Sequence, residues 1–358
     1  MGDLTVIINN FGEGGAQRVA SILIAAWVAQ GWRVRLVTLD AAEHEPYALP
    51  AAVERVNLQW ARHGKRSWLY KVGKRAQAFW RLRRLLARQP SDTVISFLTQ
   101  SNIVTLLALW GNRASVVISE RNDPGRQPQH WVLRVLRRRL YRRAEVVSAN
   151  SRGALQAMRG YVAESRLVYL PNPLPPPTCA PQAARDPAFL MVARLVEQKG
   201  IAQALAAFQQ ANIPGWHLDI VGEGPLRGEL EAQAHALGLA DRVTFHGYCD
   251  PCPFYGRAGV FLLPSHYEGT PNALLEAMQM GMPSIVSDSA AGSVEVLADG
   301  QSGLVVPVRD VSALAAAMQR LAHDTALREQ MGRVAQAQVK AYACEDVIRQ
   351  WNAILVAK

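Results

Sequence analysis

Two carboxylates and two cations stand beside predicted strand ends in the second half of the chain. Glu268 and Glu276 are separated by seven residues, Arg194 ends a predicted strand, and Lys199 precedes a predicted helix. Two cations at the end of one strand suit the binding of a diphosphate, because together they neutralise its charge. A surface cation at either position alone would be ordinary. It is therefore the pair that predicts an anion clamp.

The residues between the two glutamates predict a loop followed by a helix N-terminus. Thr270 is a good N-cap residue, and Pro271 suits the first position of a helix. Glu268 then lies in the loop at the ligand end of a strand, whereas Glu276 lies within the helix. The two carboxylates can reach different parts of one elongated ligand. The free N–H groups at the helix start would face its phosphates.

A glycine-rich loop follows the first predicted strand. Gly12, Gly14 and Gly15 let the backbone approach a ligand, next to the N–H groups of the following helix. Gln17 stands where the third glycine of a dinucleotide fingerprint would fall, and Asp40 ends the second strand. An NAD-binding interpretation is thereby weakened but stays open. A purely structural turn also accounts for the glycines.

Length and composition favour two soluble α/β domains. The chain has 358 residues, of which 49% are hydrophobic and 19% charged, and domains typically hold ~50–200 residues. This composition excludes a disordered chain, a coiled coil and a polytopic membrane protein. The best apolar run, 19–29, is shorter than the ~20 residues that a spanning helix needs. Because the chain begins almost directly on a strand-like segment, we expect no signal peptide and a cytoplasmic location.

Apolar, β-branched segments alternate with helical ones, which predicts parallel sheets with crossover helices. Five prolines between 171 and 177 interrupt this pattern and indicate a linker. We expect strands at 4–10, 34–40, 93–98, 115–120, 145–149 and 167–170, and after the linker at 189–194, 217–221, 243–246, 260–264, 284–287 and 304–307. We expect helices at 225–237, 271–280, 311–323 and 345–356.

These elements predict two Rossmann-type halves in tandem. Ligands of such folds bind at the carboxyl ends of the strands, so two halves that face each other would enclose a cleft. We expect a first domain over 1–170, a linker over 171–182, a second domain over 183–343, and a C-terminal helix within 344–358 that packs back on the first domain.

The net charge of +10 is concentrated in the first half. Residues 1–170 carry 26 Lys and Arg against 11 Asp and Glu, whereas residues 171–358 carry 13 against 18. Two segments, Arg62–Arg88 and Trp131–Arg143, interleave basic residues with tryptophan. They predict contact with an anionic membrane surface, where each Lys or Arg contributes ~1 kcal/mol. Solvated helix faces are the alternative, and no nucleic-acid partner is expected because no nucleic-acid module accompanies the charge.

Four cysteines are too few for a disulfide framework in a chain of this length. Cys249 and Cys252 form a C-x-x-C pair, but no second pair supplies the other half of a zinc site. The pair also follows a predicted strand in a loop, whereas a redox pair would open a helix. We therefore expect incidental free thiols at these two positions and at Cys179 and Cys344.

Taken together, the motifs resemble the retaining GT-B glycosyltransferases, which have two Rossmann-like domains. The resemblance covers essentially the whole chain and is strongest to the bacterial branch that acts on undecaprenyl-diphosphate-linked sugars in lipopolysaccharide, capsule and lipid-linked glycan assembly. The residues that carry it are Gly14-Gly15-Ala16-Gln17-Arg18, Arg194 with Lys199-Gly200, Gly222-Glu-Gly-Pro225, and Glu268-x7-Glu276.

The resemblance implies a retaining hexosyltransferase. It would move a sugar from a nucleotide sugar, UDP-hexose or UDP-N-acetylhexosamine, to a polyprenyl-diphosphate-linked oligosaccharide. The family's mechanism is front-face attack through an oxocarbenium-like state, without a carboxylate nucleophile. The enzyme would associate peripherally with the inner face of the cell membrane.

Residue roles follow from the same resemblance. Arg194 and Lys199 would neutralise the donor diphosphate as negative charge develops on the leaving group. Glu276 would hydrogen-bond the ribose, and Glu268 would contact and orient the transferred sugar. The remaining donor-binding positions would form a phosphate cradle, mainly through backbone N–H groups: Gly14, Gly15, Gly269, Thr270, Pro271 (which has no N–H itself), Asn272, Ala273 and Leu274.

One position departs from the family pattern. Many relatives carry a histidine at the end of the fourth strand of the first domain, where it contacts the donor sugar, and here Arg121 takes that place. Arginine cannot shuttle a proton at neutral pH. Either Arg121 makes an electrostatic version of the sugar or acceptor contact, or Glu120 or Asn122 takes over. A plain polar loop at the strand end is the alternative.

No Asp-x-Asp occurs in the chain, so the metal-dependent route of the other main glycosyltransferase fold has no ligands. We expect no metal and no cofactor besides the nucleotide-sugar co-substrate. Two other function classes are alternatives. An NAD-dependent Rossmann oxidoreductase would leave the proline linker and the Glu268-x7-Glu276 motif without a role. A non-catalytic basic module that binds membranes would show salt-dependent binding without nucleotide dependence.

Overall fold

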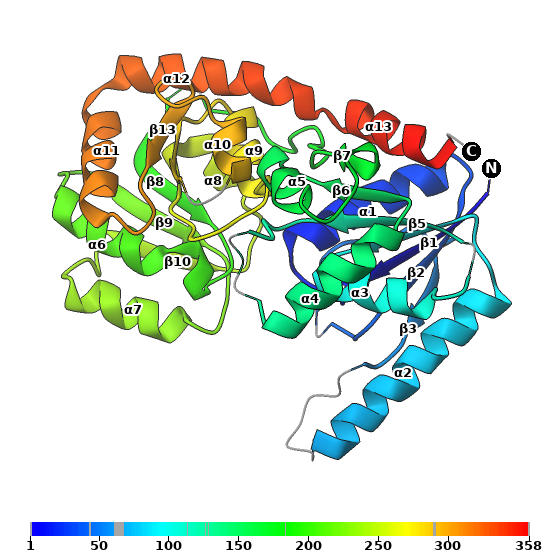
Figure 1. Ribbon diagram of the computed structural model, residues 1–358. Helices are drawn as coiled ribbons and strands as arrows, with labels where there is room; N and C mark the ends of the chain where they lie inside the picture. Colours follow the sequence, from blue (N-terminus) through cyan, green and yellow to red (C-terminus); the bar gives the residue numbers. More distant parts are fainter. Residues whose placement is uncertain are drawn as a thin grey trace. The chain divides into compact units, whose positions relative to one another are not determined.

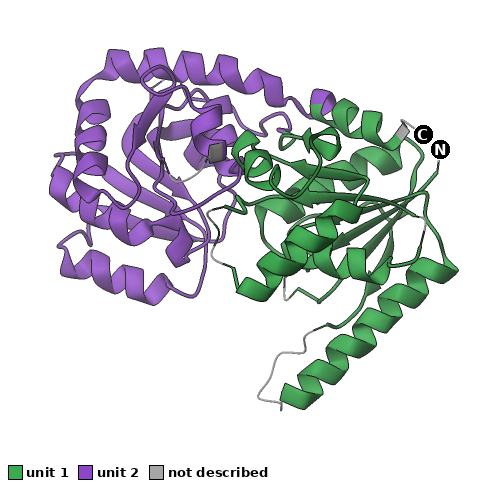
Figure 2. Cartoon of the chain, viewed as in Figure 1, with its two compact units in different colours: residues 1–173, 347–358 green, residues 174–346 purple. Residues whose placement is uncertain are grey.

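The chain folds into two compact α/β units (Figures 1 and 2). Unit 1 comprises residues 1–173 and 347–358, and unit 2 comprises residues 174–346. The computed structural model describes residues 2–42, 44–60, 68–112, 114–125, 127, 129–182, 184–288 and 291–356. Each unit has its own parallel sheet, so the expectation of two Rossmann-like α/β domains is confirmed.

Unit 1 contains a seven-stranded parallel sheet of order β3-β2-β1-β4-β5-β6-β7. Strand β3 was not predicted from the sequence. It lies at the sheet edge and is largely exposed, so it lacks the apolar pattern that marks a buried strand. The strands are β1 (Asp3–Ile8), β2 (Arg33–Thr38), β3 (Glu54–Asn57), β4 (Thr93–Phe97), β5 (Ser115–Glu120), β6 (Val146–Ala149) and β7 (Leu167–Tyr169).

Helices cover both faces of this sheet (Figure 1). Successive residues of β1 serve opposite faces: Ile7 packs with the side that α2, α3 and α5 cover, and Ile8 with the side that α1 covers. The helices are α1 (Gly15–Ala29), α2 (Trp68–Arg88), α3 (Thr99–Ala108), α4 (Trp131–Leu140) and α5 (Arg152–Met158), with 3₁₀ turns η1 (Tyr141–Arg143) and η2 (Glu164–Arg166).

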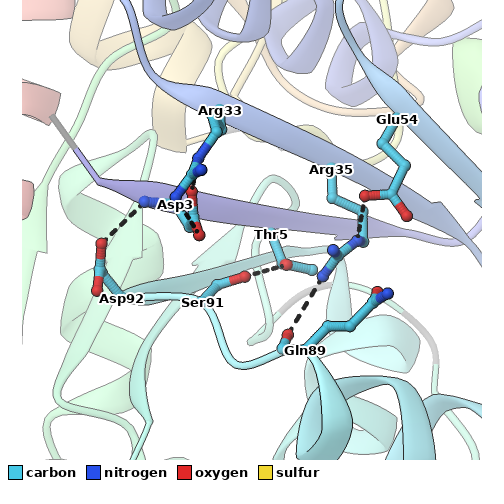
Figure 3. A network of polar contacts seen from close by, with 8 residues as sticks. All are labelled: Asp3, Thr5, Arg33, Arg35, Glu54, Gln89, Ser91 and Asp92. Atoms are coloured by element: carbon cyan, nitrogen blue, oxygen red, sulfur yellow. Dashed lines mark hydrogen bonds and ion pairs between the residues drawn. The ribbon is translucent and has the colours of Figure 1, made fainter.

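A polar network ties the amino ends of the strands in unit 1 together (Figure 3). Arg33 donates two hydrogen bonds to the Asp3 carboxylate, and the Asp3 backbone N–H donates to Asp92 over 2.8 Å. Arg35 pairs with Glu54 at 2.8 Å and so holds the edge strand β3. Each of these ion pairs has one largely exposed side chain, Arg33 or Glu54, so each pair is worth at most ~1 kcal/mol. They lie at the sheet edge opposite the carboxyl ends of the strands.

Unit 2 contains a six-stranded parallel sheet of order β10-β9-β8-β11-β12-β13. Its strands are β8 (Asp186–Val192), β9 (His217–Val221), β10 (Val243–Gly247), β11 (Ala258–Leu263), β12 (Ser284–Ser287) and β13 (Gly303–Val306). Its helices are α6 (Ile201–Ala211), α7 (Arg227–Ala236), α8 (Cys252–Arg257), α9 (Asn272–Gln279), α10 (Ala291–Val296), α11 (Val311–His323) and α12 (Thr325–Gln338), with turns η3 (Glu197–Lys199) and η4 (Val339–Tyr342).

The last helix, α13 (Cys344–Val356), belongs to unit 1 from Val347 onward. Trp351 is fully buried there, with its ring 6.0 Å from that of Trp27 and 5.8 Å from that of Phe97. Trp27 also donates a hydrogen bond to Asn352 over 3.1 Å. The final turns of the chain are therefore a packed part of the first unit.

The proline-rich segment follows the surface of unit 2 after Leu174. The Leu174 N–H donates to the Tyr342 carbonyl over 2.9 Å, and Gln279 donates to the Pro175 carbonyl over 3.0 Å. No helix of the described residues is long and apolar enough to cross a membrane.

The expectation of free thiols is wrong for two of the four cysteines. Cys179 and Cys252 form a disulfide across 73 residues of sequence. Cys252 also begins α8, although the sequence placed it in a loop. The segment after the prolines folds back along α8, as the hydrogen bond from Gln182 N–H to the Gly256 carbonyl shows. Cys249 and Cys344 are free.

Candidate functional site

A lysine and a glutamate meet at the carboxyl edge of the unit 2 sheet. Lys199 ends the turn after β8, and its Nζ contacts Glu268 Oε1 in the loop after β11. The Glu268 side chain is 9% exposed and that of Lys199 is 20% exposed. The two strands are neighbours in the sheet, which brings these distant residues together. The pair can present one cation and one further carboxylate oxygen to a ligand at this edge.

Gly200 makes this approach sterically feasible. Its φ of +66° is left-handed, and a Cβ there would lie 2.1 Å from the Pro264 carbonyl oxygen. Only glycine satisfies both conditions without a shift of the backbone. The glycine of the Lys199-Gly200 motif therefore allows the turn after β8 to pack closely against the residues that follow β11.

Hydrogen bonds join the two loops that carry the pair. The His266 N–H donates to the Gln198 carbonyl over 2.7 Å, and Gln198 Nε2 donates to the Tyr267 carbonyl over 2.8 Å. Ser265 donates to Glu268 over 3.2 Å. Sequence reasoning missed Gln198 and Ser265, although both stand next to motif residues. They hold the Glu268 carboxylate in place before any ligand arrives.

Arg194 stands at the same edge and is exposed. The backbone beside it is fixed, because the Leu195 N–H donates to the Glu223 carbonyl over 2.8 Å. Gly222, with φ +137°, allows this contact, since a Cβ there would lie 2.0 Å from the Ala193 carbonyl oxygen. Gly222-Glu-Gly-Pro225 thus supports the loop that carries Arg194.

The pKa of Tyr267 responds to the charges of Glu268, Glu197 and Arg194. Burial raises the pKa of its phenol, Glu268 and Glu197 raise it further, and the charge of Arg194 lowers it. Arg194 therefore acts electrostatically on the loop that carries Glu268. Neighbouring His266 has its pKa lowered by burial and by Arg309, whose Nη2 lies 3.5 Å from His266 Nδ1. A neutral His266 adds no charge to the site at neutral pH.

The start of α9 differs in detail from the prediction. The helix begins at Asn272, with extended Pro271 in the N-cap position and no side-chain cap, so Thr270 is not the cap. Proline has no polar side chain and so cannot cap the helix itself. Asn272, Ala273 and Glu276 are half-buried on one helix face, whereas Leu274 belongs to the core and Gly269 and Thr270 are buried.

The glycine loop of unit 1 is held by asparagine. Gly14 precedes α1 and Gly15 begins it, and the Gly14 carbonyl accepts a 3.2 Å hydrogen bond from Tyr47. Asn10 Oδ1 accepts hydrogen bonds from the Gly12 N–H at 3.3 Å and from Gln17 at 3.1 Å. Gln17, which breaks the dinucleotide fingerprint, is thus a structural support of the loop. Asn10 was not singled out from the sequence.

The strand-end residues of β5 are arranged differently from those of β11. Glu120 is 1% exposed and accepts hydrogen bonds from Thr99 over 3.0 Å and from the Tyr141 hydroxyl. Burial raises the pKa of Glu120, and hydrogen bonds from Tyr141 and Thr99 and the Arg137 charge oppose that rise. Its carboxylate is occupied within the unit, so the structure favours a positioning role over substrate contact.

Arg121 is also buried, at 6% exposure. Its guanidinium carbon lies 5.2 Å from the Phe97 ring and 5.5 Å from the Trp351 ring, and Nη1 donates to Asn172 over 2.8 Å. Burial lowers the pKa of Arg121 to about 9. Arg121 thereby joins the end of β5 to the linker and to α13. Asn122 is half-buried, which leaves it the most accessible of the three.

The two basic segments form helices with exposed aromatic residues. Trp68 and Trp80 of α2 are 70% and 54% exposed, and Trp131 of α4 is 62% exposed. Helix α2 carries seven Lys and Arg and no acidic residue. Residues 62–67 of the predicted segment lie outside the described residues. Arg137 of α4 does not lie on an exposed face of its helix: it is buried and donates a hydrogen bond to Gln129 over 2.8 Å.

Comparison with protein families identifies the class. Residues 14–173 match the Glycosyl transferase 4-like domain, and residues 181–338 match Glycosyl transferases group 1. Together with the two parallel Rossmann-like sheets, these matches show that the chain belongs to the GT-B glycosyltransferases.

Individual relatives extend this result. One relative is the GalNAc-alpha-(1->4)-GalNAc-alpha-(1->3)-diNAcBac-PP-undecaprenol alpha-1,4-N-acetyl-D-galactosaminyltransferase of Campylobacter jejuni. The two proteins are 26% identical over 97% of this chain and 96% of the relative. This chain is 34% identical to an exopolysaccharide phosphotransferase of Streptomyces coelicolor over 53% of its length, but spans only 21% of that protein. The Anabaena protein HepE in complex with UDP has a TM-score of 0.80 at 18% identity, over 99% of this chain and 100% of that one, and shows the shared fold.

Proposed function

We propose that this protein transfers a sugar from a UDP-sugar to a polyprenyl-diphosphate-linked oligosaccharide, with retention of anomeric configuration. The observation that carries the proposal is the Lys199–Glu268 pair at the carboxyl edge of β8 and β11. The name of the Campylobacter jejuni relative includes an undecaprenol-linked acceptor and N-acetylgalactosamine, which supports this acceptor class and a UDP-N-acetylhexosamine or UDP-hexose donor. UDP bound by the Anabaena protein supports the nucleotide.

Each residue of the site would contribute one step. Arg194 and Lys199 neutralise the donor diphosphate, and the N–H groups at the start of α9 donate hydrogen bonds to its oxygens. Glu268, already held by Lys199 and Ser265, orients the transferred sugar through its remaining lone pairs. Glu276 binds the ribose. Gly14 and Gly15 offer backbone N–H groups at the start of α1.

The leaving group departs without a metal in this proposal. A developing diphosphate charge can be stabilised by two cations and a helix N-terminus as well as by a divalent ion. Among the described residues, no group of three His, Cys, Asp or Glu side chains is placed to hold a metal. The test is transfer activity in excess chelator: unchanged turnover agrees with the proposal, and turnover restored only by added Mg²⁺ or Mn²⁺ contradicts it.

Helices α2 and α4 would bring the enzyme to an anionic membrane surface. Trp68, Leu69, Val72 and Trp80 are exposed on α2, although water disfavours such apolar surface. Its basic residues offer ~1 kcal/mol each near anionic lipid. Helix α4 repeats the pattern, with Trp131 and Val135 exposed next to arginines. The enzyme would thus work at the inner face of the cell membrane, where a polyprenyl acceptor resides.

Donor binding is tested first by thermal shift. Wild type, Lys199→Ala and the control Lys340→Ala, which alters an exposed lysine of the same unit, are heated with UDP, GDP, ADP, NAD and UDP-sugars. A ligand that binds only the native state raises Tm. We expect a rise with UDP and a UDP-sugar that Lys199→Ala loses and Lys340→Ala keeps. A rise with NAD alone would contradict the proposal. Retention is then read from the anomeric NMR signal of the product.

Membrane contact has its own test. Co-sedimentation with vesicles that contain phosphatidylglycerol is compared for wild type, Trp68→Ser/Trp80→Ser, and a control, Trp110→Ser, that removes an exposed tryptophan outside both helices. We expect the double variant to lose most binding while its Tm is unchanged, and binding to neutral vesicles to be weak. Equal binding by all three proteins would contradict a docking role for α2.

A further inference from the structure

Three cysteines of unit 2 lie on two segments that touch. Cys179 follows the proline-rich segment, and Cys252 begins α8, and these two form the disulfide. Thr178 donates a hydrogen bond to Cys252 Sγ over 3.1 Å. Arg185 donates to the carbonyls of Tyr255 at 3.1 Å and Ala258 at 2.8 Å. Residues 178–182 and Arg185 are therefore held against α8 and the start of β11, with the disulfide near the beginning of this stretch.

The third thiol, Cys249, is exposed and stands three residues before Cys252. Two sulfurs at C-x-x-C spacing are close enough to form a disulfide in many proteins. Partial desolvation and the Asp250 charge raise the pKa of the Cys249 thiol, so most of it is protonated at neutral pH. The disulfide can therefore persist beside a thiol that reacts only through its minor thiolate fraction.

We propose that Cys249 exchanges with the disulfide, so that the three cysteines form a thiol–disulfide switch. The Cys249 thiolate attacks Sγ of Cys252, and a Cys249–Cys252 bond forms as the Cys179–Cys252 bond breaks. The bonding electron pair leaves with the Cys179 sulfur, which takes up the proton that Cys249 lost. One disulfide and one thiol remain, so no oxidant or reductant is consumed.

The exchange changes what the loop between β10 and α8 is tied to. This loop follows the carboxyl end of β10, which is the edge of the sheet that also carries Arg194 and Glu268. In one form the loop end is linked to the segment at Cys179, and in the other it is closed on itself through Cys249. Loop order at the ligand edge then depends on which disulfide is present. The effect on donor binding rests on the proposed function, but the exchange itself does not.

Peptide mapping tests the exchange directly. Trypsin separates peptide 167–185, which contains Cys179, from peptide 243–257, which contains Cys249 and Cys252. Wild type is equilibrated in reduced and oxidised glutathione, blocked with iodoacetamide and digested. We expect two forms: peptides 167–185 and 243–257 cross-linked with one alkylated cysteine, and peptide 243–257 internally closed with Cys179 alkylated. Absence of the internally closed peptide would overturn the proposal.

Variants separate the two disulfides. Cys179→Ser should form the Cys249–Cys252 bond when oxidised glutathione accepts two electrons and is reduced to two thiols. Cys249→Ser should hold only the Cys179–Cys252 bond, and the control Cys344→Ser should behave as wild type. UDP affinity is then compared between Cys179→Ser and Cys249→Ser, with a several-fold difference expected. If mapping succeeds but UDP binds neither wild type nor variants, the proposed function fails and the switch stands.

Discussion

Glu120 ends strand β5 and Glu268 lies in the loop after strand β11, both at the carboxyl ends of parallel strands, yet their surroundings differ. Glu268 is buried and contacts a lysine at the carboxyl edge of the unit 2 sheet. Glu120 is 1% exposed and is held by the hydroxyls of Thr99 and Tyr141 inside unit 1. A position at the carboxyl end of a strand thus indicates the side of the sheet on which ligands bind. The neighbouring cation or hydroxyl decides whether the carboxylate serves a ligand or the fold.

This difference predicts that substitutions at the two positions affect different properties most, activity at one and stability at the other. Changes at the Lys199–Glu268 pair should reduce activity most, because the pair stands at the ligand edge of the sheet, and loss of Lys199 should also cost stability because the buried Glu268 carboxylate loses its cation. Changes at Glu120 should reduce stability first, because buried hydrogen-bond partners would be left unsatisfied.

The largest expected effect is that of Lys199→Ala on turnover. Removal of one group that stabilises a developing charge costs ~10²–10³-fold in kcat, and Tm should also fall because the buried Glu268 carboxylate loses its cation. Lys199→Arg keeps the charge but not the shape and should recover part of the activity. Steady-state transfer from a UDP-sugar measures both, with Lys340→Ala as control. Equal activity of wild type and Lys199→Ala would mean that Lys199 is no more than a partner of Glu268 and takes no part in transfer.

Glu120 provides the opposite case. Glu120→Ala should lower the free energy of unfolding by about 2–4 kcal/mol, because it leaves a cavity and removes the acceptor for two hydroxyls. Urea denaturation gives this value.

The pH dependence sharpens the same prediction. The pKa of Glu120 is raised in the folded state, so that state binds more protons than the unfolded one above the unfolded pKa of ~4.3. The free energy of unfolding contributed by Glu120 therefore falls as pH rises from the unfolded towards the folded pKa. Glu120→Gln should remove this slope. A slope unchanged in Glu120→Gln would assign it to other groups.

Much of the fold follows from the sequence, because it depends on local patterns. The apolar runs at 217–221 and 284–287 coincide with β9 and β12, and the helix at 311–323 coincides with α11. Strand β3 (Glu54–Asn57) escaped prediction because a largely exposed edge strand carries no apolar signal.

The site was only partly predictable, because its geometry depends on strand order. That Lys199 and Glu268 share an edge follows from both succeeding parallel strands. Their direct contact requires β8 and β11 to be neighbours, which spacing does not reveal. The Cys179–Cys252 disulfide likewise depends on the chain returning along α8. The burial of Glu120 depends on Tyr141, which η1 supplies from later in the chain.

A smaller effect is expected at Asn122, the half-buried member of the β5 strand end. If it donates one hydrogen bond to sugar or acceptor, Asn122→Ala loses ~0.5–1.5 kcal/mol, or roughly 2–12-fold in kcat/KM. Stability should stay within ~0.5 kcal/mol, as for other surface substitutions. Transfer kinetics and urea denaturation on one preparation test both. A stability loss as large as that of Glu120→Ala would place Asn122 with the fold rather than the ligand.

The smallest effect is expected at the opposite edge of the unit 1 sheet (Figure 3). Arg33 pairs with Asp3 there, and the Arg33 side chain is 83% exposed. Solvent and salt screen such pairs, so Arg33→Ala should cost at most ~1 kcal/mol, and less as salt rises. Turnover should match wild type, because ligands of parallel sheets bind at the carboxyl ends of the strands. Denaturation at low and high salt, with transfer kinetics beside it, measures this. A fall in turnover at constant stability would contradict this expectation. It would mean that residues at the amino ends of the strands also take part in the reaction.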